Sequence, residues 1–296
     1  MSTPLYAGIE LGGTKAVCLV GTDIHHIEAE LRIPTSRPEE TLGELADYLG
    51  RYPELAGLGI GAFGPLNLDA DSPEFGKLEV TPKPDWQQVD IYGFFKQKFA
   101  CPIAIDTDVA AAGLAEYHYG AGKNLRNFVY VTLGTGIGAA TILDGKPLQG
   151  LSHPEMGHLT LVRAEGDQGF ESACPFHSSC LEGLASGTAI SKRWGAPLNA
   201  WPGEHPAWEF QAHYLAEFCH ALVLFLSPQR IIFGGGVASE ALLQRVREKL
   251  LQKMNGYVNS LLTVAAVEQL VCLPELVGKA GPYGSLLLGM FSAPKV

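Results

Sequence analysis

The chain has 296 residues, of which 47% are hydrophobic and 18% charged, so it can bury a sizeable core as one large domain or two ordinary ones. Its net charge of -10 and the absence of Lys or Arg runs argue against a nucleic-acid partner. No leader pattern or membrane-length apolar run is visible, and the six cysteines are unevenly spaced, so we expect a cytoplasmic protein with no membrane partner and no disulfide framework.

The first 120 residues predict the order β-β-β-α-β-α-β-α from alternating apolar runs and helical spacing. The expected strands are Leu5–Ile9, Ala16–Val20, Ile24–Ile33, Leu55–Ala62 and Pro102–Ile105. The expected helices are one that begins at Pro38 and continues through Leu49, then Asp90–Phe99 and Val109–Tyr119. The glycine pair at the tip of the first hairpin allows a tight turn there.

A second series of strands and helices follows from residue 128. The expected strands are Phe128–Leu133, a partner that runs through Ile142, Leu159–Val162 and Gln229–Phe233. The expected helices are Pro206–Leu226, Ser239–Met254 and Tyr283–Phe291. Both series open with a strand, a Gly-Thr turn and a strand, which favours duplicated α/β domains over a generic α/β enzyme.

The two glycine turns are the first candidate binding elements. Backbone N–H groups of Gly12 and Gly13 can wrap a phosphate, with a hydroxyl from Thr14 and a charge from Lys15, although an apolar hairpin with a glycine tip is also common structure. The second turn contains Gly134-Thr135-Gly136. No Walker-A pattern is present, and the glycines at 234–236 lack Rossmann spacing, so a P-loop NTPase and a dinucleotide dehydrogenase are disfavoured.

Several carboxylates follow predicted strands or lie in predicted loops. Asp106 and Asp108 stand where a strand becomes a helix, where a carboxylate can accept a proton from a substrate hydroxyl, or merely cap the helix. Glu155 and Glu182 lie further along the chain. Carboxylates spread over loops suit a substrate with many hydroxyl groups, although each could be a surface residue.

The segment from residue 174 to 180 carries a metal-ligand pattern. Cys174, His177 and Cys180 form C-x2-H-x2-C, and His158 upstream supplies a possible fourth ligand. Two thiolates and two imidazoles would complete tetrahedral Zn²⁺ with no open position, which is the structural type of zinc site. The alternative is a chance cluster that contains two free thiols.

Together these segments resemble the ROK family of bacterial sugar kinases, and within it the branch of zinc-containing fructokinases. The resemblance spans essentially the whole chain. It rests on GIELGGTKAVCLVG (8–21), GAFGPLNLD (61–69), TPKPDW (81–86), DTDVAAAGLAE (106–116), TLGTGIGAA (132–140), PEMGH (154–158), CPFHSSCLEGLASG (174–187) and IIFGGGV (231–237). Their shared order is specific, whereas any one of them is not.

The resemblance implies an actin/hexokinase-like (ribonuclease H-like) two-domain ATPase fold of the α/β class, with an interdomain active-site cleft. An N-terminal domain of residues 1–120, completed by the C-terminal helix 283–296, and a C-terminal domain of residues 121–282 are expected. The implied reaction is transfer of the γ-phosphoryl group of MgATP to O6 of D-fructose. The implied cofactors are Mg²⁺ and structural Zn²⁺, and the partners are ATP, the sugar and a second copy in a homodimer.

The resemblance also assigns roles to residues. Asp108 would be the general base, and the phosphate-binding residues would be Gly12, Gly13, Thr14, Lys15, Gly134, Thr135 and Gly136. The residues near adenosine would be Gly235 and Gly236, with Gly284 in a Gly281–Ser285 turn close by. The sugar-binding residues would be Gly64, Glu155, His158 and Glu182, and the zinc ligands His158, Cys174, His177 and Cys180.

Three positions depart from the commonest family pattern. Glu10 replaces an Asp, although the fructokinase branch often has Glu, and Thr107 and Ala110 occupy positions where Asn is usual. Thr107 fits the branch. Ala110 lacks an amide that can hold the sugar or the Asp loop, which leaves the choice of sugar open.

The alternatives within the family are a glucokinase, a mannokinase and an N-acylhexosamine kinase. Outside enzymes, the alternatives are a sugar-sensing regulator and a sugar-binding protein. Regulators of the family carry an N-terminal helix-turn-helix domain, for which the phosphate motif at residue 8 leaves no room. Retention of Asp108 and both glycine turns argues against a binding protein without activity.

Overall fold

The computed structural model describes residues 3–293, which divide into two compact units. Unit 1 comprises the chain up to Tyr119, Lys146–Pro154 and the segment from Gly278 onward. Unit 2 comprises Gly120–Gly145 and Glu155–Val277. The predicted helix 283–296 corresponds to α9 (Ala280–Ser292), and residues 294–296 of that prediction lie outside the described residues.

Unit 1 is a five-stranded mixed sheet with helices on both faces. The strands are β1 (Leu5–Leu11), β2 (Lys15–Asp23), β3 (His26–Pro34), β4 (Leu55–Ala62) and β5 (Ile103–Thr107). Their order is β3-β2-β1-β4-β5, antiparallel across β3, β2 and β1 and parallel across β1, β4 and β5. The helices are α1 (Pro38–Leu49), α2 (Ile91–Lys98), α3 (Asp108–Tyr119) and α9, with a 3₁₀ turn, η1 (Pro84–Trp86).

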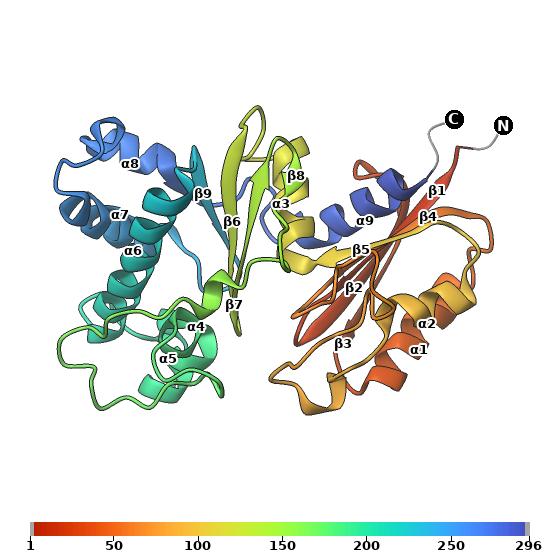
Figure 1. Cartoon of the computed structure of the whole chain (residues 1–296), viewed down its shortest axis with the longest axis horizontal. Helices are drawn as coiled ribbons and strands as arrows, with labels where there is room; N and C mark the ends of the chain where they lie inside the picture. The colour runs from red at the N-terminus through yellow and green to blue at the C-terminus, as the bar shows by residue number, and fades with distance from the viewer. Residues whose placement is uncertain (1–2, 294–296) are drawn as a thin grey trace. The chain divides into compact units, whose positions relative to one another are not determined.

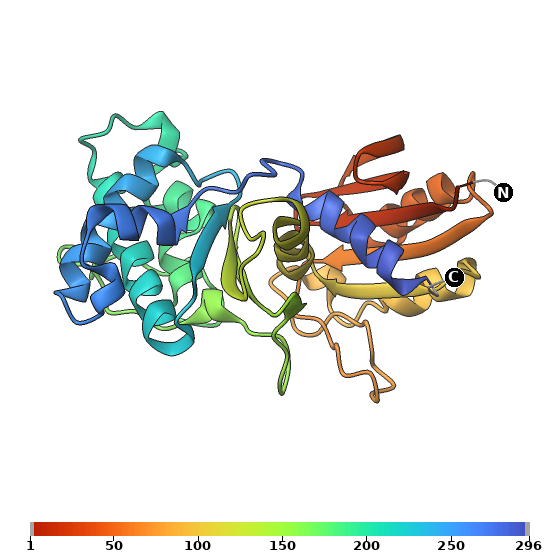
Figure 2. The same cartoon turned by 90° about the horizontal axis from the view of Figure 1, so that it is seen from above.

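The C-terminal helix α9 runs along one face of this sheet, while α1 and α2 cover the opposite face (Figure 1). Figure 2 shows α9 lying lengthwise over the first strands. Glycine in the strands makes this close approach possible. A Cβ at Gly59 of β4 would lie 1.9 Å from the carbonyl oxygen of Ser285, and one at Gly8 of β1 would lie 2.2 Å from the amide nitrogen of Leu286.

Unit 2 repeats the mixed-sheet pattern. Its strands are β6 (Asn127–Leu133), β7 (Ile137–Leu143), β9 (Arg230–Gly234) and β10 (Val271–Cys272), in the order β10-β9-β6-β7, and the two-residue β8 (Lys146–Pro147) follows β7 in the chain. The pair β6–β7 is antiparallel, whereas β6–β9 and β9–β10 are parallel. Each sheet therefore begins with a hairpin whose first strand also pairs with a parallel strand, as expected for duplicated α/β domains.

The helices of unit 2 pack around a core of buried aliphatic and aromatic side chains. They are α4 (Leu181–Ala185), α5 (Gly187–Trp194), α6 (Pro206–Leu226), α7 (Glu240–Met254) and α8 (Val264–Leu270), and short 3₁₀ turns are η2 (Met156–His158), η3 (Leu198–Ala200) and η4 (Asn259–Leu261). Among the helices of residues 3–293, none combines the length and apolar character that crossing a membrane requires.

Two local predictions are wrong. Residues 159–162 form no strand, since only Thr160 makes a β-bridge, to Cys180. The segment Gly281–Ser285 is part of helix α9 and not a turn, because α9 already begins at Ala280.

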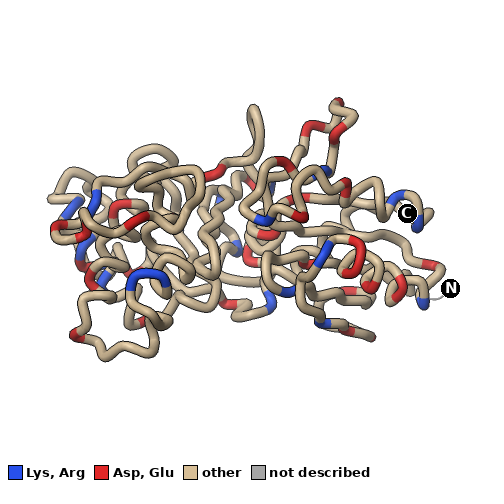
Figure 3. The backbone as a smooth tube through the Cα atoms, turned by 90° about the horizontal axis from the view of Figure 1, so that it is seen from below, with Lys and Arg blue, Asp and Glu red and all other residues tan. Residues whose placement is uncertain are grey.

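Acidic and basic residues are interspersed along the described backbone (Figure 3).

Candidate active site and metal centre

The first glycine turn connects β1 to β2 and is fixed from behind by the strand β3. The Gly12 N–H donates to the carbonyl oxygen of Lys15 at 3.0 Å. At the end of β3, Thr35 donates its hydroxyl to the Gly12 carbonyl at 2.7 Å and its N–H to the Thr14 carbonyl at 3.0 Å. The side chains of Thr14 and Lys15 are exposed at the tip of the turn. The turn is therefore held in place through its carbonyl groups and through the Gly12 N–H, which is occupied within the hairpin.

Asp108 stands at the junction of β5 and α3. The N-capping hydroxyl is that of Thr107, which accepts from the Ala110 N–H at 3.2 Å. The carboxylate of Asp106 accepts the Thr107 N–H at 2.7 Å, and that of Asp108 accepts the Val109 N–H at 2.8 Å. Because Thr107 caps the helix, Asp108 is available for another role.

Asp108 and Glu10 of β1 form an acidic pair within unit 1. Burial raises the pKa of Asp108 to about 6. Burial, then the charge of Asp108, raise the pKa of Glu10 to about 7, against the opposing effects of Lys15 and Arg32. Glu10 packs against the start of α9, where a Cβ at Gly281 would lie 1.9 Å from its carboxylate oxygen. A carboxylate that titrates near pH 6 is ionised at neutral pH and is a stronger base than an ordinary Asp.

The raised pKa of Glu10 predicts that Glu10→Gln stabilises the ligand-free protein at alkaline pH. The folded wild type binds the proton of Glu10 more tightly than the unfolded chain does. The stability that protonated Glu10 gives the wild type is therefore complete below the ordinary Glu pKa and is lost as the pH rises through about 7, whereas the variant does not lose it. We expect the variant to exceed the wild type by roughly 1–3 kcal/mol at pH 8 and to lose that advantage towards pH 5. Denaturant unfolding at both pH values measures the difference.

The matched control for this prediction is Glu28→Gln, which changes an exposed glutamate of the same sheet, on β3. It should leave the free energy of unfolding unchanged within about 0.5 kcal/mol at both pH values. Equal stability of Glu10→Gln and the wild type at pH 8 would show that Glu10 is not destabilised by ionisation in the folded state.

The second glycine turn, between β6 and β7, is held by the N-terminus of α5. The Gly134 N–H donates to the carbonyl of Gly136 at 3.0 Å, and the Gly134 carbonyl accepts from the Gly187 N–H at 2.7 Å. The hydroxyl of Thr188 donates to the Thr135 carbonyl at 2.8 Å. The residues that end one hairpin and begin a helix some fifty positions later are therefore joined in one rigid loop pair.

Glu182 lies at this second turn. Its carboxylate accepts the Ile137 N–H at 2.9 Å, and a Cβ at Gly136 would lie 2.5 Å from the same oxygen. The structure thus brings one residue predicted to bind sugar together with a residue predicted to bind phosphate. The contact orients the carboxylate and also requires a glycine at position 136.

The four predicted zinc ligands converge in unit 2. The Cys174 sulfur lies 3.7 Å from His158 Nδ1 and 3.6 Å from His177 Nδ1, and the Cys180 sulfur lies 3.7 Å from His158 Nδ1. All four ligand atoms lie within 4.8 Å of one another. Tetrahedral Zn²⁺ with ordinary Zn–S and Zn–N bonds separates its ligand atoms by about 3.5 Å, so the donor set and spacing fit the ion.

Backbone N–H groups also support this cluster. The Phe176 N–H faces the Cys174 sulfur and the Gly183 N–H faces the Cys180 sulfur, each at 3.4 Å. Such contacts stabilise thiolates. Burial raises the pKa of Cys180 to about 12, so binding of a metal there would release a proton.

Glu155 approaches the outer side of the cluster. Its carboxylate lies 3.9 Å from Nε2 of His158, whose Nδ1 points to the cysteines. At this distance the carboxylate faces the second nitrogen of the imidazole but lies beyond hydrogen-bond distance. The turn η2 that carries His158 packs on β7, since a Cβ at Gly157 would lie 1.8 Å from the Ile137 carbonyl. Glu155, His158 and the metal ligands are therefore tied to the second glycine turn.

The remaining predicted glycines have different surroundings. Gly64 follows β4 in unit 1 and precedes a cis peptide bond to Pro65. Gly235 adopts φ +90° in unit 2, and a Cβ there would lie 2.4 Å from the Leu133 carbonyl, whereas Gly236 faces open space. Gly284 lies inside α9 in unit 1, where a Cβ would meet the Ala111 carbonyl of α3 at 1.8 Å. Its contact is helix packing, and its predicted role near adenosine stays a prediction.

Two side chains near these elements were not singled out by the sequence reasoning. Thr35 anchors the first turn, and His153 accepts the Leu66 N–H at 3.0 Å just after the Gly64–Pro65 bond. Neither belongs to a spacing pattern, since both contacts join residues distant in the chain. The one sequence signal that could have indicated His153 is its position directly before the PEMGH segment.

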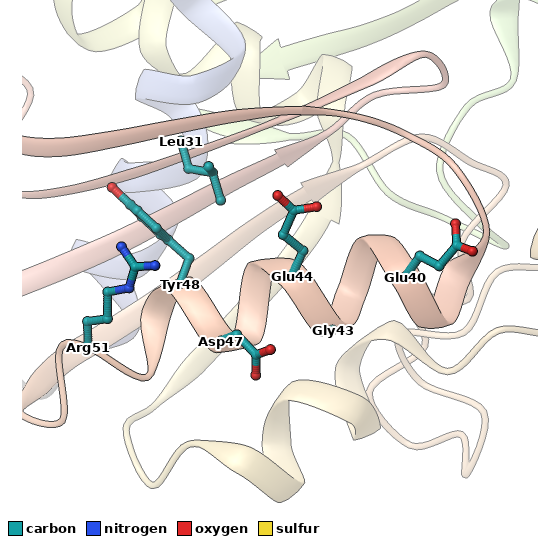
Figure 4. A pocket seen from close by; sticks show the side chains of 7 residues that line it. All are labelled: Leu31, Glu40, Gly43, Glu44, Asp47, Tyr48 and Arg51. Carbon is teal, nitrogen blue, oxygen red and sulfur yellow. The ribbon is translucent and has the colours of Figure 1, made fainter.

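A shallow hollow over α1 shares no residue with either glycine turn (Figure 4). Three of its seven lining residues are acidic, and one arginine lies at its end. Its lining residues are Leu31, Glu40, Gly43, Glu44, Asp47, Tyr48 and Arg51. These residues lie on α1, just beyond its C-terminal end and on β3, and nothing in their chemistry matches a phosphoryl-transfer site.

Comparison with known proteins places the chain among sugar kinases. Residues 6–288 match the ROK family. A fructokinase of Zymomonas mobilis subsp. mobilis is 45% identical over 300 residues, covering 98% of each chain. A putative fructokinase of Bacillus subtilis is 37% identical over 285 residues, covering 96% of this chain and 95% of that protein. The crystal structure of a ROK hexokinase from Thermus thermophilus superposes with a TM-score of 0.75 at 25% identity, covering 97% of this chain and 98% of that one.

Proposed function

The chain belongs to the ROK family and is a sugar kinase with the actin/hexokinase-like fold, and on this premise we propose that it is a fructokinase. The proposed reaction transfers the γ-phosphoryl group of ATP to O6 of D-fructose. The observation that carries the proposal is Asp108, a carboxylate at the β5–α3 junction that does not cap the helix and whose pKa is raised to about 6. The choice of fructose is supported by relatives named fructokinase at 45% and 37% identity.

In this proposal Asp108 accepts the proton of the sugar hydroxyl as its oxygen attacks the terminal phosphorus of ATP. The bond from that phosphorus to the bridging oxygen breaks, and ADP leaves with the electron pair. The glycine turn 12–15 of unit 1 and the turn 134–136 of unit 2 bind phosphate oxygens through backbone N–H groups other than those of Gly12 and Gly134, which donate within their own turns. Phosphoryl transfer depends mostly on such positioning and charge stabilisation.

Mg²⁺ would enter with ATP and neutralise charge on its phosphate oxygens. The carboxylate of Glu10 fits this ion, because Mg²⁺ is usually held by one or two carboxylates together with substrate phosphates. Lys15 at the tip of the first turn lies close enough to affect the Glu10 pKa. Both residues would therefore act near the phosphate groups and not on the sugar ring.

For the sugar we propose Glu155, His158 and Glu182 of unit 2 and Gly64 of unit 1 as binding residues. Carboxylates accept hydrogen bonds from hydroxyl groups, and the Nε2–H of a zinc-bound His158 would donate one to a hydroxyl oxygen. We further propose that Zn²⁺ bound by His158, Cys174, His177 and Cys180 is structural, because four protein ligands leave no open position for chemistry. Gly235 and Gly236 are proposed to contact adenosine, and a homodimer stays a prediction from the resemblance.

A panel of acceptors tests the proposed substrate. We expect ADP formation with fructose to show the highest kcat/KM among fructose, glucose, mannose and N-acetylmannosamine. The transfer position is tested with 6-deoxyfructose, which should not be phosphorylated, and with 1-deoxyfructose, its matched control, which should be. A higher kcat/KM for another sugar of the panel would show that this sugar, and not fructose, is the preferred substrate. Phosphorylation of 6-deoxyfructose would overturn the assignment to O6.

A further inference from the structure

The segment 81–86 of unit 1 is anchored by a buried tryptophan, and none of the proposed binding or catalytic residues lies in it. Trp86 of η1 is 2% exposed, and its indole N–H donates to the Ser36 carbonyl at 2.9 Å. Its ring meets that of Phe63 edge to face, with centroids 5.4 Å apart. The Trp86 N–H donates to the carbonyl of Lys83 at 3.0 Å. The backbone of Lys83 is therefore fixed by a buried anchor three residues away.

The side chain of Lys83 extends from this anchor to the first glycine turn. Its Nζ lies 5.7 Å from the centre of the Phe63 ring, a cation–π contact. A Cβ at Gly13 would lie 3.8 Å from Lys83 Cε, so the side chain passes directly beside the turn. Phe63 is itself tied to the base of the turn, since its N–H donates to the Leu11 carbonyl at 2.8 Å.

No carboxylate neutralises the Lys83 ammonium group. Burial alone lowers its pKa, and among residues 3–293 no acidic side chain offsets this effect. Elsewhere in unit 1 a partly buried lysine has such a partner, as Lys77 does in Glu74. An anchored cation without an anionic partner, beside a glycine turn, is suited to an anion that comes from outside the protein.

Resting on the proposed function, we propose that Lys83 binds the phosphoryl group that is transferred at the Gly12–Lys15 turn. The group that Lys83 would bind is a phosphoryl oxygen. Either the terminal phosphate of ATP or the phosphate of the sugar product can supply it. The ammonium group is a compact point charge with three donors, suited to a phosphoryl group whose charge is spread over several oxygens. Lys83 would touch the reacting group, and Phe63 and Trp86 would position it.

The test compares Lys83→Met with Lys98→Met. Lys98 is the matched control, because its Nζ lies 5.0 Å from the centre of the Phe94 ring and it belongs to helix α2 of the same unit. We expect Lys83→Met to lower kcat roughly 100-fold, the usual effect of removing one donor to a developing anion, and Lys98→Met to leave it unchanged. Lys83→Arg, which keeps the charge, should recover at least part of kcat.

Calorimetry without turnover identifies the source of the phosphoryl group. If Lys83 contacts the donor, Lys83→Met weakens binding of the β,γ-imido analogue of ATP about tenfold or more and leaves ADP binding unchanged. If it contacts the product, the variant weakens fructose 6-phosphate binding instead. The proposal is overturned if neither affinity changes, or if ADP, the analogue and fructose weaken together with a lower Tm, which indicates a structural role.

The analogue and ADP titrations use no sugar, so they separate this proposal from the proposed function. Suppose that the wild type does not phosphorylate fructose, while Lys83→Met weakens binding of the analogue and not of ADP. This result refutes the choice of sugar and supports the role of Lys83. A wild type that phosphorylates fructose while Lys83→Met behaves like Lys98→Met supports the fructokinase and refutes the role of Lys83.

Discussion

Replacing Asp108 by Asn is expected to lower kcat for fructose by roughly 10³-fold or more while leaving ADP binding unchanged. General-base catalysis contributes about 10²–10⁴ to such reactions, and an amide cannot accept the proton. The fold should survive, because the amide oxygen of Asn can still accept the Val109 N–H and Thr107 still caps α3. Steady-state kinetics, with ADP titration by calorimetry, measure both quantities.

The matched control is Asp106→Asn. Asp106 is two residues away on the same β5–α3 junction, and burial raises its pKa to about 6 as well. Its carboxylate accepts the Thr107 N–H and, at 3.4 Å, a hydrogen bond from Gln149. An amide oxygen can keep the first of these contacts, so kcat should change less than about tenfold. A larger loss of kcat in Asp106→Asn than in Asp108→Asn would show that Asp106 is the general base.

The pH profile of the wild type adds a second readout for Asp108. Because its pKa is raised to about 6, the base is ionised at neutral pH and becomes protonated as the pH falls through 6. The wild-type kcat/KM should therefore fall about tenfold per pH unit below that value. The residual activity of Asp108→Asn should lack this acid limb. An acid limb that persists in the variant would belong to another group.

Long elements with clear end signals were predictable from sequence. The strand Leu55–Ala62 and the helix Pro206–Leu226 have the predicted bounds, because one is a continuous apolar run and the other begins with a proline, which favours the first turn of a helix. Helices α4, α5 and α8 were missed because each has eight residues or fewer. Too few periodic positions fall within such lengths to reveal a buried face.

The wrong strand at 159–162 has a specific cause. Leu161 is buried and Val162 is 80% exposed, so the alternation typical of a strand is present. The Leu161 N–H, however, donates to the Ser179 carbonyl, and Leu181 donates to the Leu159 carbonyl. The segment pairs with the loop that carries the metal ligands and not with a sheet. Local periodicity does not contain that information, because the partner lies about twenty residues away.

The candidate site shows the same division between local and distant information. The turns, the Asp108 junction and the C-x2-H-x2-C spacing are local patterns and could be recognised in sequence. The position of Glu182 against Gly136 and that of Lys83 beside Gly13 depend on how distant segments pack. Residue type indicated the carboxylate of Glu182, whereas Lys83 was not singled out, and only the packing within each unit shows which turn each side chain contacts.

Replacing Cys174 by Ser is the second change expected to have a large effect. The variant should lose Zn²⁺, which we expect at one ion per chain in the wild type, and the free energy of unfolding should fall by more than about 3 kcal/mol. The physical reason is that the loop 163–180 has no helix or strand, so the ion would be the main link between its residues 174–180 and His158. The first part of the loop has its own contacts, from Arg163 to the carbonyl groups of Asp167 and Phe170. Elemental analysis and denaturant unfolding give the two quantities.

The loss of structure in Cys174→Ser should be confined to the loop 163–180. Limited proteolysis of Cys174→Ser should cut within residues 163–180, and chelation of the wild type should reproduce both the cut and the lower stability. Cys101→Ser is the matched control, because Cys101 is a partly buried free thiol in unit 1, outside the cluster. It should keep both the zinc and the stability. A purified wild type without zinc would refute the metal site. Normal zinc in Cys174→Ser would show that Cys174 is not required as a ligand. Lost zinc with unchanged stability would show that the buried network of Arg193, Asp167 and Tyr214 suffices to hold the loop.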